Sequence, residues 1–515
     1  MAGGARISAT TLARLLDTAG GRNPGESIYR WLADRIRSAL LDGRLTVGCV
    51  LPSERELAIA LGVSRTTVVG AYRLLREQGW LNARQGSGAW LCLPGEVNND
   101  RSHASRDAAS LTAAAFGASA IFGWDQPRHR CDNIHAPDPT PEIIDLTAAC
   151  PPAPSIALMD AMDEARRQIP QYCGTDGYLP FGLPTLREVI ADRYCRNEIQ
   201  TTVEQVLITS GAQHALVLLI SLLSGPNDSV LTESPTYPVA LDALRAHRRI
   251  PIPLALAEEQ LSGCPRRFSW DLDLASAMFR RIRPRLAYMI PDFHNPTGSL
   301  MDSASREAVV NLARSTRTHL LIDEAFRDLP FPGSAPMPPP MALFDNDVVI
   351  SIGSLSKSFW GGLRVGWIRA PRRLIEQLAA ARVLVDMAGS VLDQLVAVEL
   401  LARSEQLLPE RQSQLARGAE CLAAAIGQNL PTWQPAQTTG GASMWARIPK
   451  HLRATDLALL APSYGVRIAP GPRFAPDGTM NNFVRLPFTL APETLRQGIE
   501  RLRNASSRND RVIDR

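Results

Sequence analysis

The sequence predicts an α/β protein with two domains. A small helical domain that ends in a β-hairpin comes first, and a large domain on a mainly parallel sheet follows, with a smaller α+β lobe at its C-terminal end. Three observations carry this prediction. Residues 24–93 show helical periodicity between paired cap signals. Residues 142–505 alternate short β-branched runs with amphipathic segments. A length of 515 residues with 45% hydrophobic content suits several packed domains.

The first two helices of the small domain are bounded by cap signals. Residues 23–26 (Asn-Pro-Gly-Glu) form a capping box, apolar residues recur at helical spacing over 28–40, and Gly43 ends the predicted helix. A second capping box, residues 53–56 (Ser-Glu-Arg-Glu), opens a short helix that Gly62 ends. The tight glycine turn then leads directly into a third helix.

The third helix and a hairpin complete the small domain. Ser64 caps the helix and Gly79 ends it, and the pairs Trp80-Leu81 and Trp90-Leu91 flank a turn over residues 85–88. Three helices followed by a hairpin predict a winged helix-turn-helix. The alternative is an ordinary three-helix bundle whose third helix merely presents a solvated face.

The remaining short segments are predicted as tails and a linker. Residues 1–23 are expected to form a flexible N-terminal tail, and residues 506–515 a C-terminal tail. Residues 94–141 lack periodicity and are rich in proline toward their end, which predicts an interdomain linker. As a flexible coil, its roughly 48 residues span on the order of 35–40 Å. That reach is comparable to one DNA turn, so it permits a dimer to place two DNA-binding domains.

The distribution of charge and the amino-acid composition indicate which classes of partner the chain can bind. The net charge is only +4, but residues 22–93 hold ten arginines against six acidic residues, so an anionic partner is expected there. The longest apolar run, residues 215–223, is far shorter than the ~20 residues of a membrane span. Eight scattered cysteines predict neither disulfides nor a metal site, which favours a reducing cytoplasm.

Four short runs predict the strands of the large sheet: residues 229–232, 285–290, 319–322 and 347–352. Each is rich in β-branched residues and leads into a loop that carries polar side chains. Because the carboxyl ends of parallel strands share one edge of a sheet, a functional site is expected at that edge. In the last hundred residues, 441–448 and 483–488 read as strands of the smaller lobe.

Lysine is almost absent, which makes each lysine informative. Of 55 basic residues only Lys357 and Lys450 are lysine. An arginine cannot replace a lysine whose amine must lose its proton and act as a nucleophile. Lys357 follows a predicted strand in Ser-Leu-Ser-Lys-Ser, with Arg364 seven residues on, which suits a phosphate-bearing aldehyde. Lys450 lies in Pro-Lys-His and is interpreted as a surface charge.

These motifs resemble known families. Residues 142–503 are similar to class I aminotransferases of fold type I, which depend on pyridoxal 5′-phosphate (PLP). Residues 24–93 resemble the GntR-family DNA-binding domain, through Leu-Pro-Ser-Glu-Arg-Glu-Leu-Ala at 51–58 and Val-Ser-Arg-Thr-Thr-Val at 63–68. In this order the two resemble the MocR subfamily of GntR transcriptional regulators.

The resemblance implies a role for each matching position. Lys357 matches the Schiff-base lysine, Asp323 the carboxylate that pairs with the pyridine nitrogen, Asn295 the amide that donates to ring O3′, and Tyr237 the aromatic residue stacked on the ring. Each residue alone also has a structural interpretation, such as a turn, a helix cap or a core aromatic. The expected phosphate ligands are Gly211, Ala212, Gln213, Ser354, Arg364 and, from a neighbouring subunit, Tyr178.

The resemblance also implies partners and one departure. Tyr178 implies a homodimer, expected to be head-to-tail, and Arg485 matches the arginine that clamps a substrate α-carboxylate, here that of an amino-compound effector. Arg485 could instead form a structural ion pair. Where the aminotransferase pattern has a tyrosine that donates to O3′, this chain has Phe326. That loss weakens the case for an efficient aminotransferase more than for a PLP-binding sensor.

For the DNA-binding domain, the first turn of the third helix is expected to face bases and phosphates of a double-stranded operator. The expected DNA contacts are Arg55, Ser64, Arg65, Thr66, Thr67, Gln85 and Gly86, the last two from the wing. Some GntR relatives carry a second arginine on this helix where this chain has Val69.

The sequence therefore predicts a PLP-dependent, DNA-binding transcriptional regulator of the bacterial cytoplasm. One alternative is an active aminotransferase with an accessory DNA-binding module. Another is a degenerate scaffold that binds DNA without a cofactor, which the intact set of Lys357, Asp323 and Asn295 disfavours.

Overall fold

A computed structural model describes residues 7–17, 27–41, 45, 49–77, 80–84, 88–92, 143–259 and 266–513 of the chain. The chain forms two compact units: the larger comprises residues 140–470 and 482–515, and the smaller comprises the residues before 140 together with residues 471–481. The predicted linker, the capping box at 23–26, both helix stops at Gly43 and Gly79, and the wing residues Gln85 and Gly86 lie outside the described residues. No helix in the described ranges is long and apolar enough to cross a membrane.

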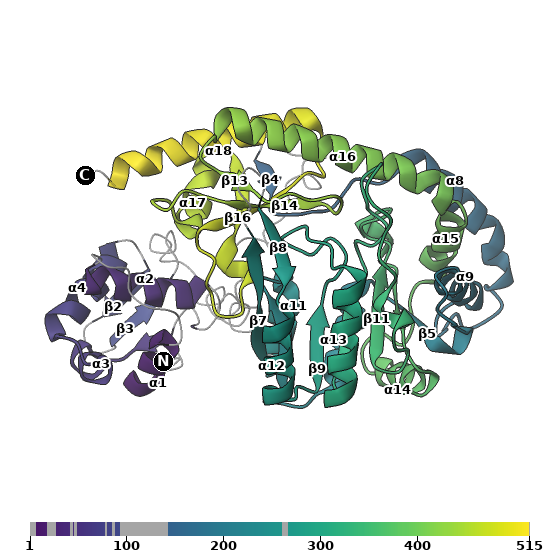
Figure 1. The fold of residues 1–515 in the computed structure, drawn as a ribbon, viewed down its shortest axis with the longest axis horizontal. Helices are drawn as coiled ribbons and strands as arrows, with labels where there is room; N and C mark the ends of the chain where they lie inside the picture. Colours follow the sequence, from purple (N-terminus) through teal and green to yellow (C-terminus); the bar gives the residue numbers. More distant parts are fainter. Residues whose placement is uncertain are drawn as a thin grey trace. The chain divides into compact units, whose positions relative to one another are not determined.

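The smaller unit contains the three predicted helices, α2 (Ile28–Leu41), α3 (Glu54–Leu61) and α4 (Arg65–Glu77) (Figure 1). The capping box at Ser53 is present: the backbone N–H of Glu56 donates to Ser53 Oγ, and the Ser53 N–H donates to Glu56 Oε2 at 3.0 Å. Gly62 ends α3 in the left-handed region, at φ 65°. Tight capping on both sides of this turn fixes the angle between α3 and α4.

The predicted hairpin is present, with one strand more than expected. β2 (Leu81–Arg84) and β3 (Gly88–Leu91) pair antiparallel in register Leu81 with Leu91. β1 (Val50–Leu51) pairs with the other side of β3, so the wing is a three-stranded sheet. A two-residue strand is too short to leave a periodic signal in the sequence.

The prediction of a flexible tail over residues 1–23 is wrong for its central part. Residues Ala9–Asp17 form helix α1, which Ser8 caps by accepting the N–H of Thr11 at 3.1 Å. Leu12 and Leu16 of this helix are almost fully buried in the same core as α2, α3 and α4. These two leucines are four residues apart and therefore lie on one face of the helix. The helix is short and is surrounded by Gly, Ser and Thr residues, so its apolar periodicity is not recognisable in the sequence.

Truncation of the α1 core contact is expected to destabilise the smaller unit. Leu12→Ala removes a buried side chain at 0% exposure, which typically costs about 2–5 kcal/mol. Faster hydrogen exchange of the amides in α2 and α3 of the full chain would report this loss. Thr10→Ala, at an exposed position of the same helix, serves as the control. Equal exchange in the two variants would show that α1 contributes nothing to this core.

The larger unit is built on an eight-stranded, mainly parallel sheet. The strands in spatial order are β5 (Val206–Thr209), β12 (Gly366–Arg369), β11 (Val349–Ser354), β10 (His319–Asp323), β9 (Leu286–Met289), β6 (Ser229–Ser234), β7 (Ile250–Glu259) and β8 (Arg267–Trp270). The four strands predicted from the β-branched runs are confirmed as β6, β9, β10 and β11. β12 runs antiparallel to both of its neighbours. β9 and β11, near the centre of the sheet, are buried along their whole length, so both faces are covered there.

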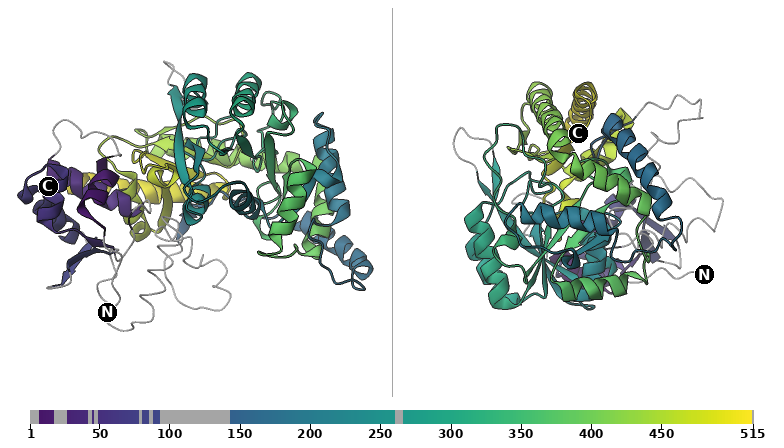
Figure 2. Two further views of the ribbon diagram at one scale, coloured as in Figure 1. Left: turned by 90° about the horizontal axis from the view of Figure 1, so that it is seen from below. Right: turned by 90° about the vertical axis from the view of Figure 1, so that its right-hand side faces the viewer.

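The smaller lobe of this unit holds a second sheet and two long helices. Its sheet order is β13 (Gln434–Pro435), β14 (Ser443–Arg447), β16 (Phe483–Pro487), β15 (Val466–Pro470) and β4 (Ile144–Leu146). Helices α16 (Ser404–Asn429) and α18 (Pro492–Ile513) lie side by side (Figure 2). The predicted tail over residues 506–515 is wrong as far as Ile513, because α18 continues to that residue.

Candidate cofactor site and DNA-reading helix

Two neighbouring parallel strands bring Asp323 and Lys357 to one edge of the large sheet. Asp323 is the last residue of β10, and β11 ends at Ser354, three residues before Lys357. In the register of β10 with β11, Asp323 lies opposite Ile352. The ammonium of Lys357 lies 5.9 Å from the ring centroid of Phe326, and its charge opposes the rise that burial causes in the pKa of Asp323. The carboxylate and the amine therefore share one site.

The carboxylate of Asp323 is buried and held on both oxygens. Tyr288 Oη donates to Asp323 Oδ2 at 2.8 Å, and the Ala325 N–H donates to Oδ1 at 3.0 Å. Burial raises the pKa of Asp323, and these two hydrogen bonds work against that rise. A buried carboxylate is stabilised by an adjacent cation, so a protonated pyridine nitrogen suits this position. Tyr288 is a contact that the sequence did not reveal.

A second part of the site lies where α10 (Ala212–Leu223) begins. Gly211 precedes the helix at φ 87°, and a Cβ there would lie 2.9 Å from Nη2 of Arg364. Arg364 Nη2 donates to the Ser210 carbonyl at 2.7 Å. Oε1 of Gln213 is buried and has no hydrogen-bond partner among the described residues. A glycine at a helix N-terminus beside a guanidinium forms a cradle for a phosphate.

Arg485, Asn295 and Tyr237 form a further group of predicted site residues. Arg485 projects from β16 and donates from Nη1 to Asn295 Oδ1 at 3.3 Å and from Nη2 to the Thr147 carbonyl. Burial lowers the pKa of Arg485 to about 10, so the guanidinium remains charged at neutral pH. Tyr237 directly precedes α11 (Pro238–Ala246) and packs against the core of the large sheet.

Lys357 and Tyr178 differ in how they are held. Lys357 Nζ donates to the Ala149 carbonyl at 2.9 Å and to Cys150 Sγ at 3.0 Å, so its amine lies beside the segment that follows β4. Ser354 is buried, and its hydroxyl accepts the N–H of Ser356 at 3.1 Å. Tyr178 has a side chain that is 56% exposed. Lys450 is exposed, as predicted.

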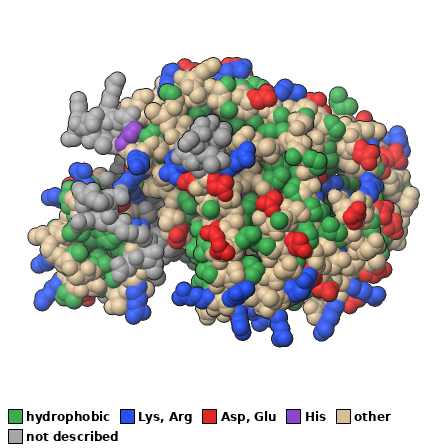
Figure 3. Space-filling model, viewed as in Figure 1, with side chains coloured by type: hydrophobic (Ala, Val, Ile, Leu, Met, Phe, Trp, Pro, Cys, Tyr) green, Lys and Arg blue, Asp and Glu red, His purple; other side chains and the backbone are tan. Residues whose placement is uncertain are grey.

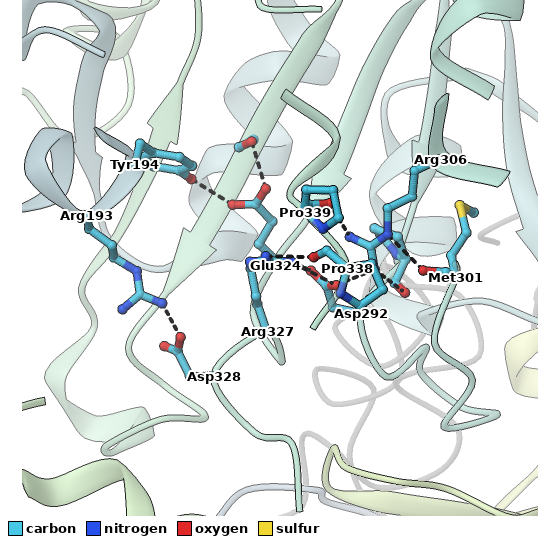
Figure 4. Close-up of polar contacts among 12 residues, drawn as sticks. Arg193, Tyr194, Asp292, Met301, Arg306, Glu324, Arg327, Asp328, Pro338 and Pro339 are labelled. Atoms are coloured by element: carbon cyan, nitrogen blue, oxygen red, sulfur yellow. Dashed lines mark hydrogen bonds and ion pairs between the residues drawn. The ribbon is translucent and has the colours of Figure 1, made fainter. Parts of the chain in front are cut away.

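Behind the site, a network that the sequence did not indicate begins at Tyr194 of α9 (Pro184–Cys195) (Figure 4). Tyr194 Oη donates to Glu324 Oε2 at 2.7 Å, and Ser351 Oγ donates to Glu324 Oε1 at 3.0 Å. Trp367 Nε1 in turn donates to Tyr194 Oη at 3.1 Å. Glu324 directly follows Asp323, so Tyr194 fixes the start of the loop that follows the site carboxylate.

The neighbouring residue of α9 reaches the loop that carries the lysine. Arg193 forms an ion pair with Asp328, which also accepts a hydrogen bond from Ser358 Oγ at 2.9 Å. Ser358 directly follows Lys357. One turn of α9 thus holds Glu324, the neighbour of Asp323, directly, and Ser358, the neighbour of Lys357, through Asp328. Figure 4 shows the contacts of Tyr194 with Glu324 and of Arg193 with Asp328. No sequence pattern reveals this link, because an Arg-Tyr pair within an amphipathic helix is unexceptional.

Removal of the Tyr194 hydroxyl is expected to weaken PLP binding. In Tyr194→Phe the buried Glu324 loses a donor and Trp367 an acceptor, a loss of about 1–3 kcal/mol, part of which is expressed as looser cofactor binding. Equilibrium titration with PLP, followed by absorbance, measures the dissociation constant. Tyr72→Phe is the matched control, because Tyr72 is equally buried and donates to the Pro52 carbonyl at 2.9 Å in the other unit. Equal PLP affinity in both variants would refute a positioning role for Tyr194.

The first turn of α4 presents the predicted DNA contacts. Ser64 Oγ accepts the N–H of Thr67 at 3.1 Å and caps the helix. Arg65 and Thr66 are exposed and Thr67 is half-buried, while Arg55 is exposed on α3. Val69 is 39% exposed, one turn beyond Arg65 on the same face. An exposed valine here suits contact with a thymine methyl group. The sequence alone does not show that this side chain is exposed.

Family comparisons agree with both halves of this description. Residues 142–502 match the model of the family "Aminotransferase class I and II", and residues 28–91 match that of "Bacterial regulatory proteins, gntR family". The chain is 28% identical over 483 residues to YisV of Bacillus subtilis, an uncharacterized HTH-type transcriptional regulator, covering 90% of this chain and 92% of YisV. It is 31% identical over 344 residues to the 2-aminoadipate transaminase of Thermus thermophilus, covering 65% of this chain and 81% of that enzyme.

A solved structure supports the same fold and cofactor. LysN, the α-aminoadipate aminotransferase of Thermus thermophilus, was solved with N-(5′-phosphopyridoxyl)-L-leucine. LysN is 28% identical in sequence to this chain, and the superposition covers 72% of this chain and 93% of LysN with a TM-score of 0.64. The fold, the cradle at Gly211 and the paired carboxylate and lysine all suit PLP. The chain belongs to the class I and II aminotransferase family and carries a gntR-family DNA-binding domain in front of it, the arrangement of MocR-type transcriptional regulators.

Proposed function

We propose that this protein is a transcriptional regulator whose binding to an operator depends on PLP, with or without an amino-compound effector, in the aminotransferase-like domain. The observation that carries the proposal is the presence of both sites in one chain. An exposed recognition-helix turn at Arg65 and Thr66 accompanies a site that holds the buried Asp323 and Asn295 and the half-buried Lys357. The chain acts in the bacterial cytoplasm, in keeping with the bacterial relatives it matches.

Each residue of the cofactor site has a proposed task. PLP, when bound, supplies an aldehyde that forms a Schiff base with an amine and a ring that withdraws electrons. Lys357 contributes the amine, and Asp323 holds a proton on the ring nitrogen. Asn295 orients O3′ and Tyr237 covers the ring face. The ligands that hold the phosphate at the α10 cradle are Gly211, Ala212, Gln213, Ser354 and Arg364.

An effector with a carboxylate fits the opposite end of this site. Arg485 is buried with its charge retained, and its planar guanidinium can bind a carboxylate through two parallel hydrogen bonds. An amine next to that carboxylate would face Lys357. We therefore propose an amino acid or a similar amine as the effector, when one is required besides PLP.

The site favours binding over turnover because Phe326 has no hydroxyl. Phe326 is 6% exposed, and its ring lies beside the Lys357 ammonium, where an aminotransferase would present a tyrosine donor. Tyr288 does not replace that donor, since its hydroxyl is committed to Asp323. Effector binding can still shift the DNA affinity, provided that the DNA-competent and DNA-incompetent states bind the effector differently.

A homodimer in head-to-tail arrangement completes the proposal. Proteins of this fold are typically dimers, and the larger unit exposes large apolar side chains on and near the packed helices α8 (Ser155–Gln168) and α15 (Val391–Ala402). Those exposed by more than 40% are Ile156, Met159, Met162, Val383, Leu384, Val385, Met387 and Leu392. An apolar surface of this extent suits a subunit interface. Tyr178, itself exposed, would then reach the phosphate of the neighbouring subunit.

An active aminotransferase is the second candidate, favoured by the identity to a 2-aminoadipate transaminase. Absorbance spectra of the PLP-loaded protein with a panel of amino acids and amines separate the two. A band that shifts with one amine and then persists supports the regulator. Conversion to the pyridoxamine form, reversed by a keto acid at catalytic rates, would support the enzyme instead.

A further inference from the structure

A group of arginines that the cofactor site does not use lies at the amino-terminal edge of the large sheet. Helices α11, α12 (Leu272–Ile282) and α13 (Ser303–Thr316) all end there, and β7, β9 and β10 begin there. On the face shown in Figure 3, Lys and Arg side chains gather along the lower border of the larger unit, below α12 and α13. The exposed members, which we call the arginine edge, are Arg248, Arg280, Arg281, Arg283, Arg285 and Arg317.

Backbone contacts bring the turns of the arginine edge together. The N–H of His319 donates to the Arg285 carbonyl at 3.0 Å, and Thr318 Oγ1 donates to the Pro284 carbonyl at 2.8 Å. The turn at Arg317 therefore lies against the turn at Arg285. Arg248 lies just before β7, which pairs with β6, and β6 pairs with β9. The turns before β10, β9 and β7 thus present arginines along one border of the sheet, with the turn before β6 between the last two.

Ion pairing within the domain does not account for these arginines. None of the six forms an ion pair with another residue in the described ranges, whereas nearby Arg245 and Arg314 pair with Asp242 and Asp345. The helix dipole favours a cation at each helix C-terminus, which explains about one arginine per helix. It does not explain four arginines among the six residues 280–285.

Their backbone conformation is also unusual. Arg248, Arg283 and Arg317 each follow a helix with φ of 59°, 48° and 57°. Glycine is favoured in this left-handed region because any Cβ is strained there. Arginine at all three positions, where glycine would relieve strain, indicates that the positive charge itself is useful at this border.

We propose that the arginine edge is a second DNA-contact surface, which binds phosphates of the duplex that flanks the operator. This inference rests on the proposed function, because the winged helix brings the DNA. Exposed guanidinium groups that form no ion pair within the described part of the chain suit the phosphates of a duplex, and such contacts read no sequence. The flanking contact would add affinity and salt dependence without changing which operator is chosen.

Matched triple variants of the full-length protein test the proposal. Arg280→Gln, Arg281→Gln and Arg317→Gln remove three charges from the arginine edge. Arg417→Gln, Arg496→Gln and Arg503→Gln remove three charges from exposed positions of α16 and α18. Operator affinity is measured over a salt series on a minimal operator duplex and on one extended at both ends. For every arginine that no longer binds a phosphate, the slope of log affinity against log salt becomes shallower by about 0.9.

The expected result is specific to one variant and one duplex. On the extended duplex, the edge variant should lose roughly two to three units of salt slope and about tenfold in affinity, while the α16 and α18 variant stays within about twofold. On the minimal duplex both should match the wild type. Equal behaviour of the two variants on the extended duplex would overturn the proposal. The proposal would also be overturned if the edge variant bound phosphatidylserine vesicles less tightly than the wild type but bound DNA equally well. That result would indicate that the arginine edge contacts a membrane surface. Failure of the wild type to bind either duplex would refute the proposed function itself.

Discussion

Lys357→Ala is expected to lose the near-visible absorption band of the bound cofactor completely. Lys357 is one of two lysines in the chain, and the only one that follows a strand of the large sheet at the edge where Asp323 lies. Alanine has no amine, so no covalent link to an aldehyde can form there. Borohydride reduction of the PLP-loaded wild type, followed by peptide mass spectrometry, should place the pyridoxyl label on Lys357 and on no other residue of the site.

The chain provides its own control for this experiment. Lys450 is the other lysine and is exposed in a turn, so Lys450→Ala should keep the full band and the same labelled peptide. A band that survives in Lys357→Ala and disappears in Lys450→Ala would overturn the site assignment. Hydrogen exchange of α3 and α4 should be unchanged in both variants, because neither lysine contributes to the smaller unit.

Arg65→Ala is expected to weaken operator binding by about five- to a hundredfold, since a specific guanidinium contact to a base contributes about 1–3 kcal/mol. Arg65 is exposed in the first turn of α4, where its removal leaves the core residues Val68 and Leu75 untouched. Fluorescence anisotropy with a labelled operator measures the affinity. The PLP spectrum should be identical to that of the wild type.

Arg73→Ala is the matched control on the same helix. Arg73 is also exposed, but it lies two turns beyond Arg65 and 3.7 Å from Glu77. A loss of affinity for Arg73→Ala as large as that for Arg65→Ala would mean that total charge, and not the first turn, determines binding. Unchanged affinity in Arg65→Ala would show that α4 is not the recognition helix.

The sequence could predict those features that leave a local signal. Caps at Ser53 and Ser64 marked the two helices of the helix-turn-helix, and β-branched runs marked the buried strands β6, β9, β10 and β11. The scarcity of lysine identifies Lys357 as a candidate site residue without any reference to the fold. These features depend on short stretches of chain, where residue type and spacing determine structure directly.

Other features depend on contacts between distant segments, and these could not be predicted. α1 looked like a tail because its two core leucines are surrounded by small polar residues. Tyr288 and Tyr194 lie 35 and 130 residues from the carboxylates to which they donate. The arginine edge consists of separate turns that only the sheet order places together. Pairing across such distances is set by the tertiary fold, for which a single sequence has no period or motif.

Cofactor occupancy is expected to control operator binding, and the direct test compares the operator affinity of the PLP-free and the PLP-loaded protein at one salt concentration. Coupling between two sites typically changes affinity by about 5- to 150-fold, so a difference of at least fivefold is predicted, in either direction, with or without an added amino acid. Lys357→Ala should show a much smaller difference. Identical affinities of the wild type with and without PLP, across the effector panel, would show that the cofactor does not control operator binding and would leave the aminotransferase-like domain without a regulatory role.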